Sequence, residues 1–432
     1  MVLKPIKIRN NKIYLSFLVF ILTFLIYLYL AVQSGKLYNP PEVGDAHDYD
    51  SMALQLSKGK GFSHNWDDPE FKQTYENNPE YNFLFDRNGE YLTTYKPPLY
   101  PLIISIIYSI FGRNFEFVRL FNLFCLSLSC TIFFYIIIIK FNLYCGGIFI
   151  ILFTSYQKFF NTAMTIMTET IAILLISILL LSVIIFIEKN NIKSLIGISL
   201  SLSFLVLNRT IFILWFFLII FLILFFSKKI KYAVLISIIC LIIILPWMIR
   251  NILLLDSIKP FGTQSDINLP IAYSDPIIEN LGEWDASIRQ KIPQTFVNSK
   301  FGLEAEIANA KLSKSVAFNW IKNNINKLPL LFYLKIVHSW KPQNNLILII
   351  YLFSFLGIIL SSNKKEIFIF LSFLILNSLT IGLTWSASDN RFLVPVFPII
   401  LILASIGIYH FFGLIKILSN PLHHKFNCTN NL

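Results

Sequence analysis

The sequence predicts an all-α, polytopic membrane protein with about ten or eleven transmembrane helices and two large extracytoplasmic loops. Hydrophobic residues make up 56% of the chain, and its mean hydropathy is +0.66. Many segments run for roughly 17 residues or more without a charge, enough to cross ~30 Å of hydrocarbon as a helix. These segments are continuously apolar rather than alternating, so we predict helices and not barrel strands.

The N-terminal part, residues 1–32, is predicted to be a cytoplasmic tail followed by the first transmembrane helix. Basic residues and no acids occur among residues 1–12, which favours a cytoplasmic location. The apolar run Ile13–Val32 is too long for a signal-peptide core and lacks a small-residue cleavage site. We attribute the net charge of +12 mainly to lysines on the cytoplasmic side and expect the lipid bilayer, not nucleic acid, as a partner.

Residues 33–98 are predicted to form the first extracytoplasmic loop, which is acidic. Up to residue 96 it holds eleven of the 24 acids of the chain against six Lys and Arg residues. A loop of this length with many aromatic residues is expected to fold onto the membrane surface. These aromatic residues are Trp66, Tyr75, Tyr81, Phe83, Phe85 and Tyr91.

A cluster of polar residues at 44–50 is the most unusual part of this loop. It places Asp45, Asp48 and Asp50 together with His47 beside a membrane, in a chain with only 14% charged residues. A solvated loop could carry such a cluster by chance. If the segment is helical, Asp45, Asp48 and Tyr49 share one face.

Residues 99–250 are predicted to be the transmembrane core, and residues 344–432 to be C-terminal transmembrane helices with a cytoplasmic tail. The apolar stretch 99–111 is short, about 20 Å as a helix, and either crosses the membrane or forms a half-helix. If it does not cross, the lysine turns at 228–231 and 363–365 both lie in the cytoplasm, so we prefer this arrangement. The other predicted spans after the first are 117–139, 144–160, 168–187, 193–208, 210–227, 231–250, 344–361, 366–384 and 393–415.

The second extracytoplasmic loop, residues 251–343, is divided by charge. Residues 252–310 contain eight acids and four bases, whereas residues 311–341 contain lysines and no acid. The apolar residues of this basic part recur at helical spacing, which predicts an amphipathic helix at the membrane interface. Such a helix suits either anionic lipid headgroups or a lipid-linked phosphate.

Charged residues at or inside the spans are few, and each is a candidate for function because burial of a charge in the membrane is costly. In the preferred topology Glu169, Arg209, Arg250 and Arg391 lie at the outer ends of helices. Arg119 lies near the outer start of its own helix. Arginines at helix ends also contact the phosphates of ordinary lipids, which is the simpler interpretation for any one of them. These residues are Arg119, Glu169, Arg209, Arg250 and Arg391.

An ordered set of short motifs runs through nearly the whole chain and resembles the GT-C glycosyltransferases. The resemblance is to the family 39-like branch of protein O-mannosyltransferases and the lipid A aminoarabinose transferase. The motifs are Gly44-Asp45 with Tyr49, Gly59-Lys60-Gly61-Phe62-Ser63, Lys96-Pro97-Pro98-Leu99-Tyr100-Pro101, Val118-Arg119-Leu120, Met167-Thr168-Glu169-Thr170, Leu207-Asn208-Arg209, Pro246-Trp247-Met248-Ile249-Arg250-Asn251, Phe261-Gly262-Thr263 with Asn268-Leu269, and Arg391-Phe392-Leu393-Val394-Pro395 with Pro398.

The resemblance implies a GT-C-like bundle and a sugar donor linked to a polyprenyl phosphate. It also implies an extracytoplasmic acceptor (lipid, glycan or protein) and inversion at the anomeric carbon. Asp45 matches the aspartate taken as general base in that family, and Glu169 matches its second acidic position. Ala46 stands where a companion glutamate is common, so a divalent metal (Mg²⁺ or Mn²⁺) on Asp45 and Glu169 stays an open expectation. The implied location is a bacterial inner membrane, with the active site on its outer side.

Elementary chemistry agrees with one carboxylate base and several cations. A phosphate leaves without protonation if its developing charge is stabilised, so a single base for the acceptor hydroxyl suffices. Our first candidates for binding the phosphate are Lys96 and Arg391, which lie near prolines at the membrane surface, and Asp48 is the alternative to Asp45 as the base. The remaining expected substrate-binding residues are His47, Tyr49, Arg119, Arg209 and Arg250.

Two other function classes suit a chain of this kind. A transporter or flippase of lipid-linked saccharides would have polar residues through the bilayer centre and repeat symmetry. Here the spans are almost entirely Ile, Leu and Phe. A polymerase or ligase of lipid-linked saccharides would use the same phosphate site.

Overall fold

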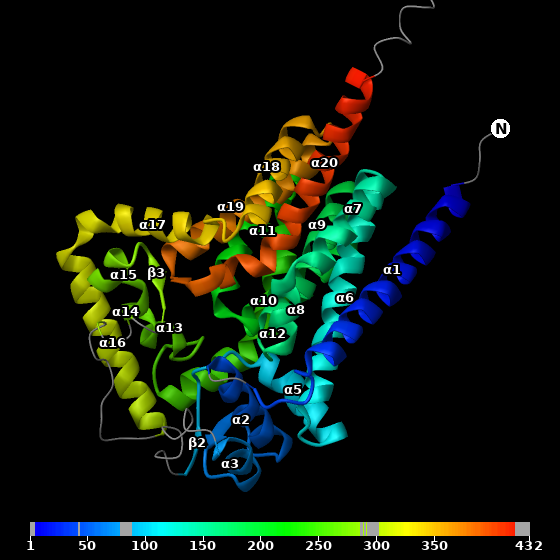
Figure 1. Cartoon of the computed structure of the whole chain (residues 1–432). Coiled ribbons are helices and arrows are strands. Elements are labelled where there is room, and N and C mark those ends of the chain that lie inside the picture. The colour runs from blue at the N-terminus through cyan, green and yellow to red at the C-terminus, as the bar shows by residue number, and fades with distance from the viewer. Residues whose placement is uncertain are drawn as a thin grey trace, which may run out of the picture.

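The structure is a computed structural model that describes residues 5–41, 44–77, 89–285, 288, 291 and 302–419. Long apolar helices form a bundle, and shorter elements belong to the two polar loops (Figure 1). The elements of the bundle are α1 (Pro5–Ser34), α5 (Leu99–Phe111), α6 (Phe115–Lys140), α7 (Leu143–Ser155), α8 (Gln157–Met164), α9 (Glu169–Lys189), α10 (Ile192–Asn208), η2 (Thr210–Phe212), α11 (Ile213–Ser227), α12 (Ile230–Leu255), α18 (Asn345–Leu360), α19 (Lys364–Leu383), η5 (Ser388–Val396) and α20 (Phe397–Ser419).

The predicted all-α polytopic architecture is confirmed. In the described part of the chain, seven helices are long and apolar enough to cross a membrane, or up to nine if each of two bent helix pairs counts as one span. The bent pair α7–α8 covers the predicted span 144–160, and α10 covers 193–208 with 17 residues. The short stretch 99–111 is a helix of its own, α5.

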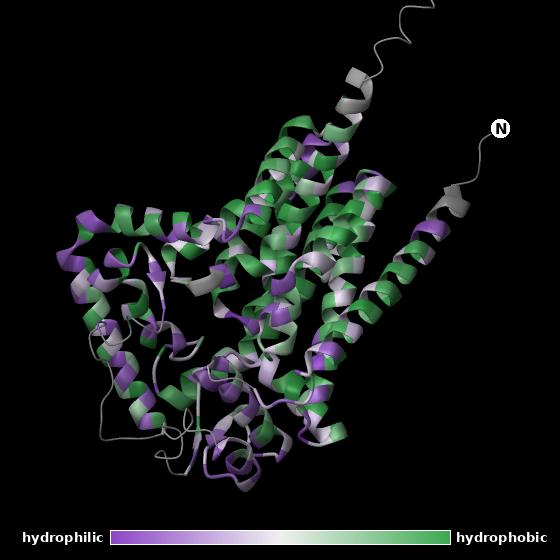
Figure 2. Cartoon of the chain, in the orientation of Figure 1, coloured by the Kyte–Doolittle hydropathy of each residue, from purple (hydrophilic) through white to green (hydrophobic). Residues whose placement is uncertain are grey.

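The two polar loops gather at one end of the bundle. In Figure 1 the start of α1 and the end of α20 lie at the top, and the elements of the first loop lie at the bottom. Hydrophilic residues concentrate in the same loops, and the helices of the bundle are mainly hydrophobic (Figure 2). Direct bonds between Glu306 and Thr94 join the two loops. This arrangement suits the predicted topology, in which both loops share one side of the membrane.

Asparagine caps start several of the apolar helices. The side chains of Asn114, Asn142, Asn191 and Asn344 accept hydrogen bonds from backbone N–H groups in the first turns of α6, α7, α10 and α18. Each cap satisfies a donor that the helix itself leaves free. The caps define where each span begins.

Glycines let α18 and α20 pack backbone to backbone. A Cβ atom at Gly357 would lie 2.0 Å from the carbonyl oxygen of Leu403, and one at Gly407 would lie 1.9 Å from that of Phe353. Small residues at such crossings bring helices close together in membranes.

The first polar loop folds around its own small core. It contains α2 (Asp45–Ser57), β1 (Ser63–Asn65), α3 (Pro69–Tyr75) and β2 (Glu90–Leu92), and β1 pairs antiparallel with β2. Trp66 and Tyr75, two of the aromatic residues from which we expected a folded loop, are buried there with Leu54 and Phe71, and Tyr91 packs against them. Tyr81, Phe83 and Phe85 lie outside the described residues.

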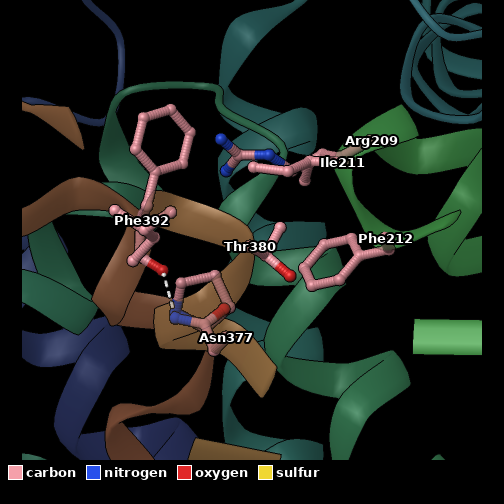
Figure 3. Close-up of a pocket in the computed structure, with 8 residues that line it drawn as sticks. Arg209, Ile211, Phe212, Asn377, Thr380 and Phe392 are labelled. Atoms are coloured by element: carbon pink, nitrogen blue, oxygen red, sulfur yellow. Dashed lines mark hydrogen bonds between the residues drawn. The ribbon is translucent and has the colours of Figure 1, made fainter. Parts of the chain in front are cut away.

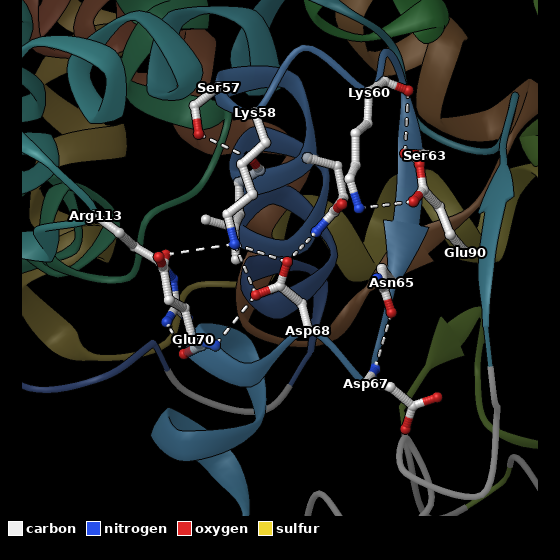
Figure 4. A network of polar contacts seen from close by, with 12 residues as sticks. Ser57, Lys58, Lys60, Ser63, Asn65, Asp67, Asp68, Glu70, Glu90 and Arg113 are labelled. Carbon is white, nitrogen blue, oxygen red and sulfur yellow. Dashed lines mark hydrogen bonds and ion pairs between the residues drawn. The ribbon is translucent and has the colours of Figure 1, made fainter.

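Ion pairs fasten the pieces of this loop together (Figure 4). Lys58, which follows α2, donates to both carboxylate oxygens of Asp68 at 2.8 Å. Asp68 in turn caps α3 by accepting from the N–H of Glu70. Lys60 pairs with Glu90 at 2.8 Å, which ties the turn after α2 to β2.

The second polar loop consists of short helices and two longer ones. Its elements are α13 (Gln264–Ile267), α14 (Leu269–Ala272), α15 (Asp275–Glu279), β3 (Glu283–Trp284), α16 (Leu303–Asn323), η4 (Ile325–Lys327) and α17 (Leu328–Trp340). The predicted basic amphipathic segment is therefore two helices, because η4 and Pro329 at the start of α17 interrupt it. The segment Ile325–Trp340, which includes α17, is bent by 103° from α18, so α17 does not continue the direction of that helix and extends away from the bundle (Figure 1).

The close crossing of α18 and α20 gives a first prediction. Gly407→Ala is expected to lower stability by ~1–3 kcal/mol, because the added methyl overlaps the backbone of α18. Gly147→Ala is the matched control, since nothing lies within 4 Å of a Cβ at Gly147. Thermal unfolding of the detergent-solubilised protein measures both. An equal melting temperature for the two variants would argue against the crossing.

The shared end of the two loops gives a second prediction, about topology. Single cysteines at the exposed positions Glu76 and Glu279 are expected to react with a membrane-impermeant maleimide added outside intact cells. Cysteines at Lys229 and Lys364 are expected to react only after the membrane is opened. Labelling of Lys229 and Lys364 variants from outside would reverse the proposed orientation.

Candidate active site

The first turn of α2 and Lys96 form the centre of the site. α2 begins at Asp45 after Gly44, whose φ of 131° is readily available only to glycine. The ammonium of Lys96 lies 2.7 Å from Asp45 Oδ1, 3.1 Å from Asp48 Oδ2 and 5.4 Å from the ring centre of Tyr49. The structure therefore brings Asp45, Asp48 and Tyr49 together on one helix face, as the spacing predicts.

Arg391 connects this centre to the ends of two bundle helices. Its Nη1 lies 3.1 Å from Asp45 Oδ2, and its Nε donates to Glu169 Oε1. Arg209, which follows α10, donates to the same oxygen of Glu169 at 2.8 Å. Three carboxylates and three cations thus form one network, which we call the charge network: Asp45, Asp48, Glu169, Lys96, Arg209 and Arg391.

The segment that carries Arg391 is held on several sides. Asn377 on α19 donates to the carbonyl oxygen of Phe392 at 3.1 Å, and Asn390 donates to that of Lys341 at 2.9 Å. The guanidinium of Arg209 stacks 4.9 Å from the ring centre of Phe392. Figure 3 shows Arg209, Asn377 and Phe392 around the small pocket beside η5. The strand β4 (Ser386–Ala387) before η5 pairs in parallel with β3 of the second loop.

The cations keep the two α2 carboxylates ionised. Desolvation alone would raise the pKa of Asp45, but the charges of Lys96 and Arg391 hold that pKa well below its usual value. For Asp48, desolvation is likewise outweighed by Lys96 and by the nearby imidazoles, so its pKa is also lowered. Although desolvation opposes it, the two carboxylates raise the pKa of Lys96 well above normal. Burial raises the pKa of Tyr49 to about 12, so its hydroxyl stays protonated at neutral pH.

Exposure differs sharply across the charge network. The side chains of Asp45 and Arg391 are 37% and 26% exposed, whereas those of Lys96 and Glu169 are 1% and 0% exposed. A molecule that approaches from the loop side can therefore reach Asp45 and Arg391. Within the described residues, Glu169 Oε2 is buried and accepts no hydrogen bond, which leaves an unsatisfied acceptor beside the charge network.

His47 braces the start of α2. Its Nδ1 accepts a hydrogen bond from the N–H of Gly44 at 3.3 Å, and its Nε2 lies 3.3 Å from Asp48 Oδ1. His47 thus contacts the charge network through Asp48 and fixes the direction in which that carboxylate points.

Arg119 and Arg250, two expected substrate-binding residues, lie outside the charge network. The buried guanidinium of Arg119 on α6 donates to the backbone carbonyl oxygens of Met164, Leu37 and Asn39, so it joins α6 to the end of α8 and to the segment that follows α1. Arg250 at the end of α12 donates to the carbonyl oxygen of Phe62 at 3.2 Å and stacks 4.7 Å from the ring centre of Trp247. These contacts hold segments of the chain together.

Asp50, the third carboxylate of the cluster, has a separate task that we did not infer from the sequence. It is fully buried, and it accepts hydrogen bonds from Tyr75 and Tyr108 at 2.8 Å and from Arg113 Nε at 3.0 Å. The helical period places it away from the face of Asp45 and Asp48. Asp50 thereby anchors α2 to α3 and to the segment between α5 and α6.

A divalent metal on Asp45 and Glu169 does not fit the side chains present. Arg391 lies between the two carboxylates, and both oxygens of Asp45 already contact cations. Among the described residues, no group of three or more His, Cys, Asp and Glu side chains is arranged to hold a metal. We therefore derive no step through a metal ion.

Comparisons with known proteins agree with the resemblance over part of the chain. Residues 95–249 match the family described as dolichyl-phosphate-mannose-protein mannosyltransferase. None of the curated proteins matches the chain.

Two similar solved structures are of ArnT from Cupriavidus metallidurans. The form bound to undecaprenyl phosphate is 11% identical and has a TM-score of 0.40, with 96% of this chain and 80% of ArnT covered. The apo form is 12% identical and has a TM-score of 0.39, with 88% and 77% covered.

The buried pairing of Glu169 gives a third prediction. Glu169→Gln is expected to destabilise the protein by ~3–5 kcal/mol, because it leaves Arg209 and Arg391 without their shared counter-charge. The exposed Glu279→Gln in the second loop is the control. Thermal unfolding in detergent is the measurement, and unchanged stability of Glu169→Gln would contradict the ion pairing described.

Proposed function

We propose that this protein is a membrane glycosyltransferase that moves a sugar from a polyprenyl-phosphate donor to an extracytoplasmic acceptor, a lipid, glycan or protein. The reaction takes place at the outer face of a bacterial inner membrane. The observation that carries the proposal is Asp45, an accessible carboxylate held between Lys96 and Arg391 at the loop end of an apolar bundle. The family match over residues 95–249 supports it.

The reaction is a single displacement at the anomeric carbon. The acceptor hydroxyl oxygen forms a bond to that carbon while the bond from carbon to the phosphate oxygen breaks, so the configuration inverts. The electron pair of the broken bond goes to the phosphate, and the hydroxyl proton goes to Asp45. A positioned carboxylate in a partly dry site can serve as this base.

While Lys96 and Arg391 both pair with Asp45, they hold its pKa low, so Asp45 is then a weak base. A donor phosphate is the anion that these same cations would bind, through charge-assisted hydrogen bonds. When the phosphate takes a share of their donors, the stabilisation of the Asp45 carboxylate weakens and its pKa rises. Donor binding thus turns Asp45 into a base at the moment when one is needed.

The total charge of the site stays constant during transfer. The charge network contains three carboxylates and three cations. A phosphodiester donor adds one negative charge, and the departing monoester gains a second. That gain is matched when Asp45 accepts the proton and becomes neutral. A water-excluded site favours such a step, because no net charge has to be stabilised anew.

The sugar is expected to lie against Glu169 and Tyr49. Glu169 Oε2 is a buried acceptor without a partner among the described residues, so we expect a sugar hydroxyl in the site to donate a hydrogen bond to it, and the Tyr49 hydroxyl stays protonated and can donate. Arg209 fixes the Glu169 carboxylate from the opposite side. His47 acts on Asp48, which holds Lys96 in place for the phosphate.

A transporter or flippase is a weaker alternative. The charged residues of the charge network lie at the ends of helices or in loops and not along the spans. A polymerase or ligase of lipid-linked saccharides would use the same chemistry with a glycan acceptor.

The role of Asp45 gives a fourth prediction. Asp45→Asn keeps the size of the side chain but removes the proton acceptor, so the transfer rate is expected to fall ~10²–10⁴-fold. Asp48→Asn is the comparison, since Asp48 contacts the same ammonium. The measurements are turnover of a polyprenyl-phosphate sugar by purified protein and, separately, binding of the donor. Full activity of Asp45→Asn would refute the mechanism, and a loss confined to Asp48→Asn would assign the base to Asp48.

A further inference from the structure

Glu306 of α16 reaches across from the second polar loop to the segment that presents Lys96. Its Oε1 accepts from the Thr94 N–H at 3.0 Å, the Thr94 hydroxyl at 2.6 Å and the Thr263 hydroxyl at 2.5 Å. Its Oε2 accepts from the Thr93 hydroxyl at 2.7 Å. Four donors on one carboxylate bring together three stretches of chain that are distant in the sequence.

These groups are shielded from water. Thr93, Thr94 and Thr263 are at most 1% exposed, and Glu306 is 9% exposed. A buried carboxylate whose bonds come from neutral donors is costly unless every bond is well formed. Such a group therefore favours one arrangement of its partners over looser ones.

The other side of the same segment is fixed as well. The Thr93 N–H donates to the carbonyl oxygen of Phe62, which also accepts from Arg250. Gly262 lies against the Thr94 carbonyl, where a Cβ would come within 2.1 Å, and its φ is +79°. The Thr93–Thr94 backbone is thus enclosed by the β1–β2 hairpin, the end of α12 and α16.

Lys96 follows this enclosed stretch by two residues, and its ammonium contacts Asp45 and Asp48. A short chain segment from a fixed backbone leaves the lysine little freedom, and a displacement of about 1 Å in a catalytic group can cost ~10²-fold in rate.

We propose that Glu306 is a positioning residue, which acts through Thr93 and Thr94 to set the Lys96 ammonium for the donor phosphate and to couple the second polar loop to the charge network. We call the bonds of Glu306 to the three threonines the threonine latch. The proposal rests on the function proposed above for Lys96, but the latch itself does not depend on turnover.

The test uses the full-length protein in detergent or nanodiscs. Glu306→Ala removes the latch, and Glu279→Ala, an exposed acid of the same loop, is the control. A matched pair at Thr94 separates the hydroxyl from the side-chain shape: Thr94→Val lacks the donor, and Thr94→Ser keeps it. Thermal unfolding establishes that each variant is folded.

Two measurements are made on the folded variants. The first is hydrogen–deuterium exchange of peptides that cover residues 89–98 and 44–57. The second is binding of undecaprenyl phosphate, together with the KM for the donor and for the acceptor.

We expect Glu306→Ala and Thr94→Val to increase exchange in both peptides, and to weaken undecaprenyl phosphate binding and raise donor KM about tenfold. Thr94→Ser and Glu279→Ala are expected to resemble the wild type, and acceptor KM is expected to change little. If Glu306→Ala does not fold, the Thr94 pair gives the decision alone.

Three results would overturn the proposal. One is unchanged exchange at 44–57, which would mean that the latch does not reach Asp45. Another is increased exchange with unchanged undecaprenyl phosphate binding, which would make Glu306 a purely structural residue. The third is an equal loss in Thr94→Ser and Thr94→Val. Absence of transfer by the wild type would instead refute the proposed function and leave the exchange and binding results to judge the latch.

Discussion

The ammonium of Lys96 lies between the carboxylates of Asp45 and Asp48 and is almost completely buried. An unpaired charge in such a place is strongly unfavourable, so the ammonium needs both acids, and they need it. This requirement determines the orientation of α2, since only one helix face can bring the two carboxylates to one nitrogen. It also explains why buried polar contacts in the two loops fix the segments that carry these residues. Asp50 anchors α2, and Glu306 binds the stretch before Lys96.

Helix spans and the α2 face were within reach of sequence reasoning because each depends on local periodicity. A continuous apolar run defines a span whatever its neighbours are, and the i, i+3, i+4 spacing of Asp45, Asp48 and Tyr49 defines a face. The bounds of α5, Leu99–Phe111, were predicted in the same way, since the apolar stretch stops at Phe111. The predicted topology placed Asp45, Glu169 and Arg391 on the same side of the membrane, and the resemblance suggested a shared site, but nothing local in the sequence reports a contact between such distant residues.

The residues that sequence reasoning missed or placed in the site are equally informative. Asp50 belonged to the cluster, but its partner Arg113 lies beyond α5, and a count of carboxylates cannot tell which of them turns away. Glu306, Thr93 and Thr94 gave no signal, since uncharged hydroxyl donors are common in any loop, and the motif that contains Thr263 did not point to Glu306 as its partner. Arg119 and Arg250 were expected to bind an anion, but in the structure each guanidinium donates to backbone carbonyl oxygens of another segment. The sequence therefore showed which charged residues were unusual, but the groups that each of them contacts depended on the tertiary structure.

The order in which the ribosome delivers the charge network has a consequence for biogenesis. Asp45 and Arg391 are separated by 346 positions, and Arg391 and Glu169 by 222. During synthesis, Glu169 and Arg209 enter the translocation machinery long before the arginine that completes their network. A nascent chain in which Arg391 has not yet been synthesised therefore carries an incomplete charge network. Insertion of the last hairpin, α19 and α20, is then the step that completes the charge network, and a chain truncated before residue 391 would lack the arginine that joins Asp45 to Glu169 however well its first helices had inserted.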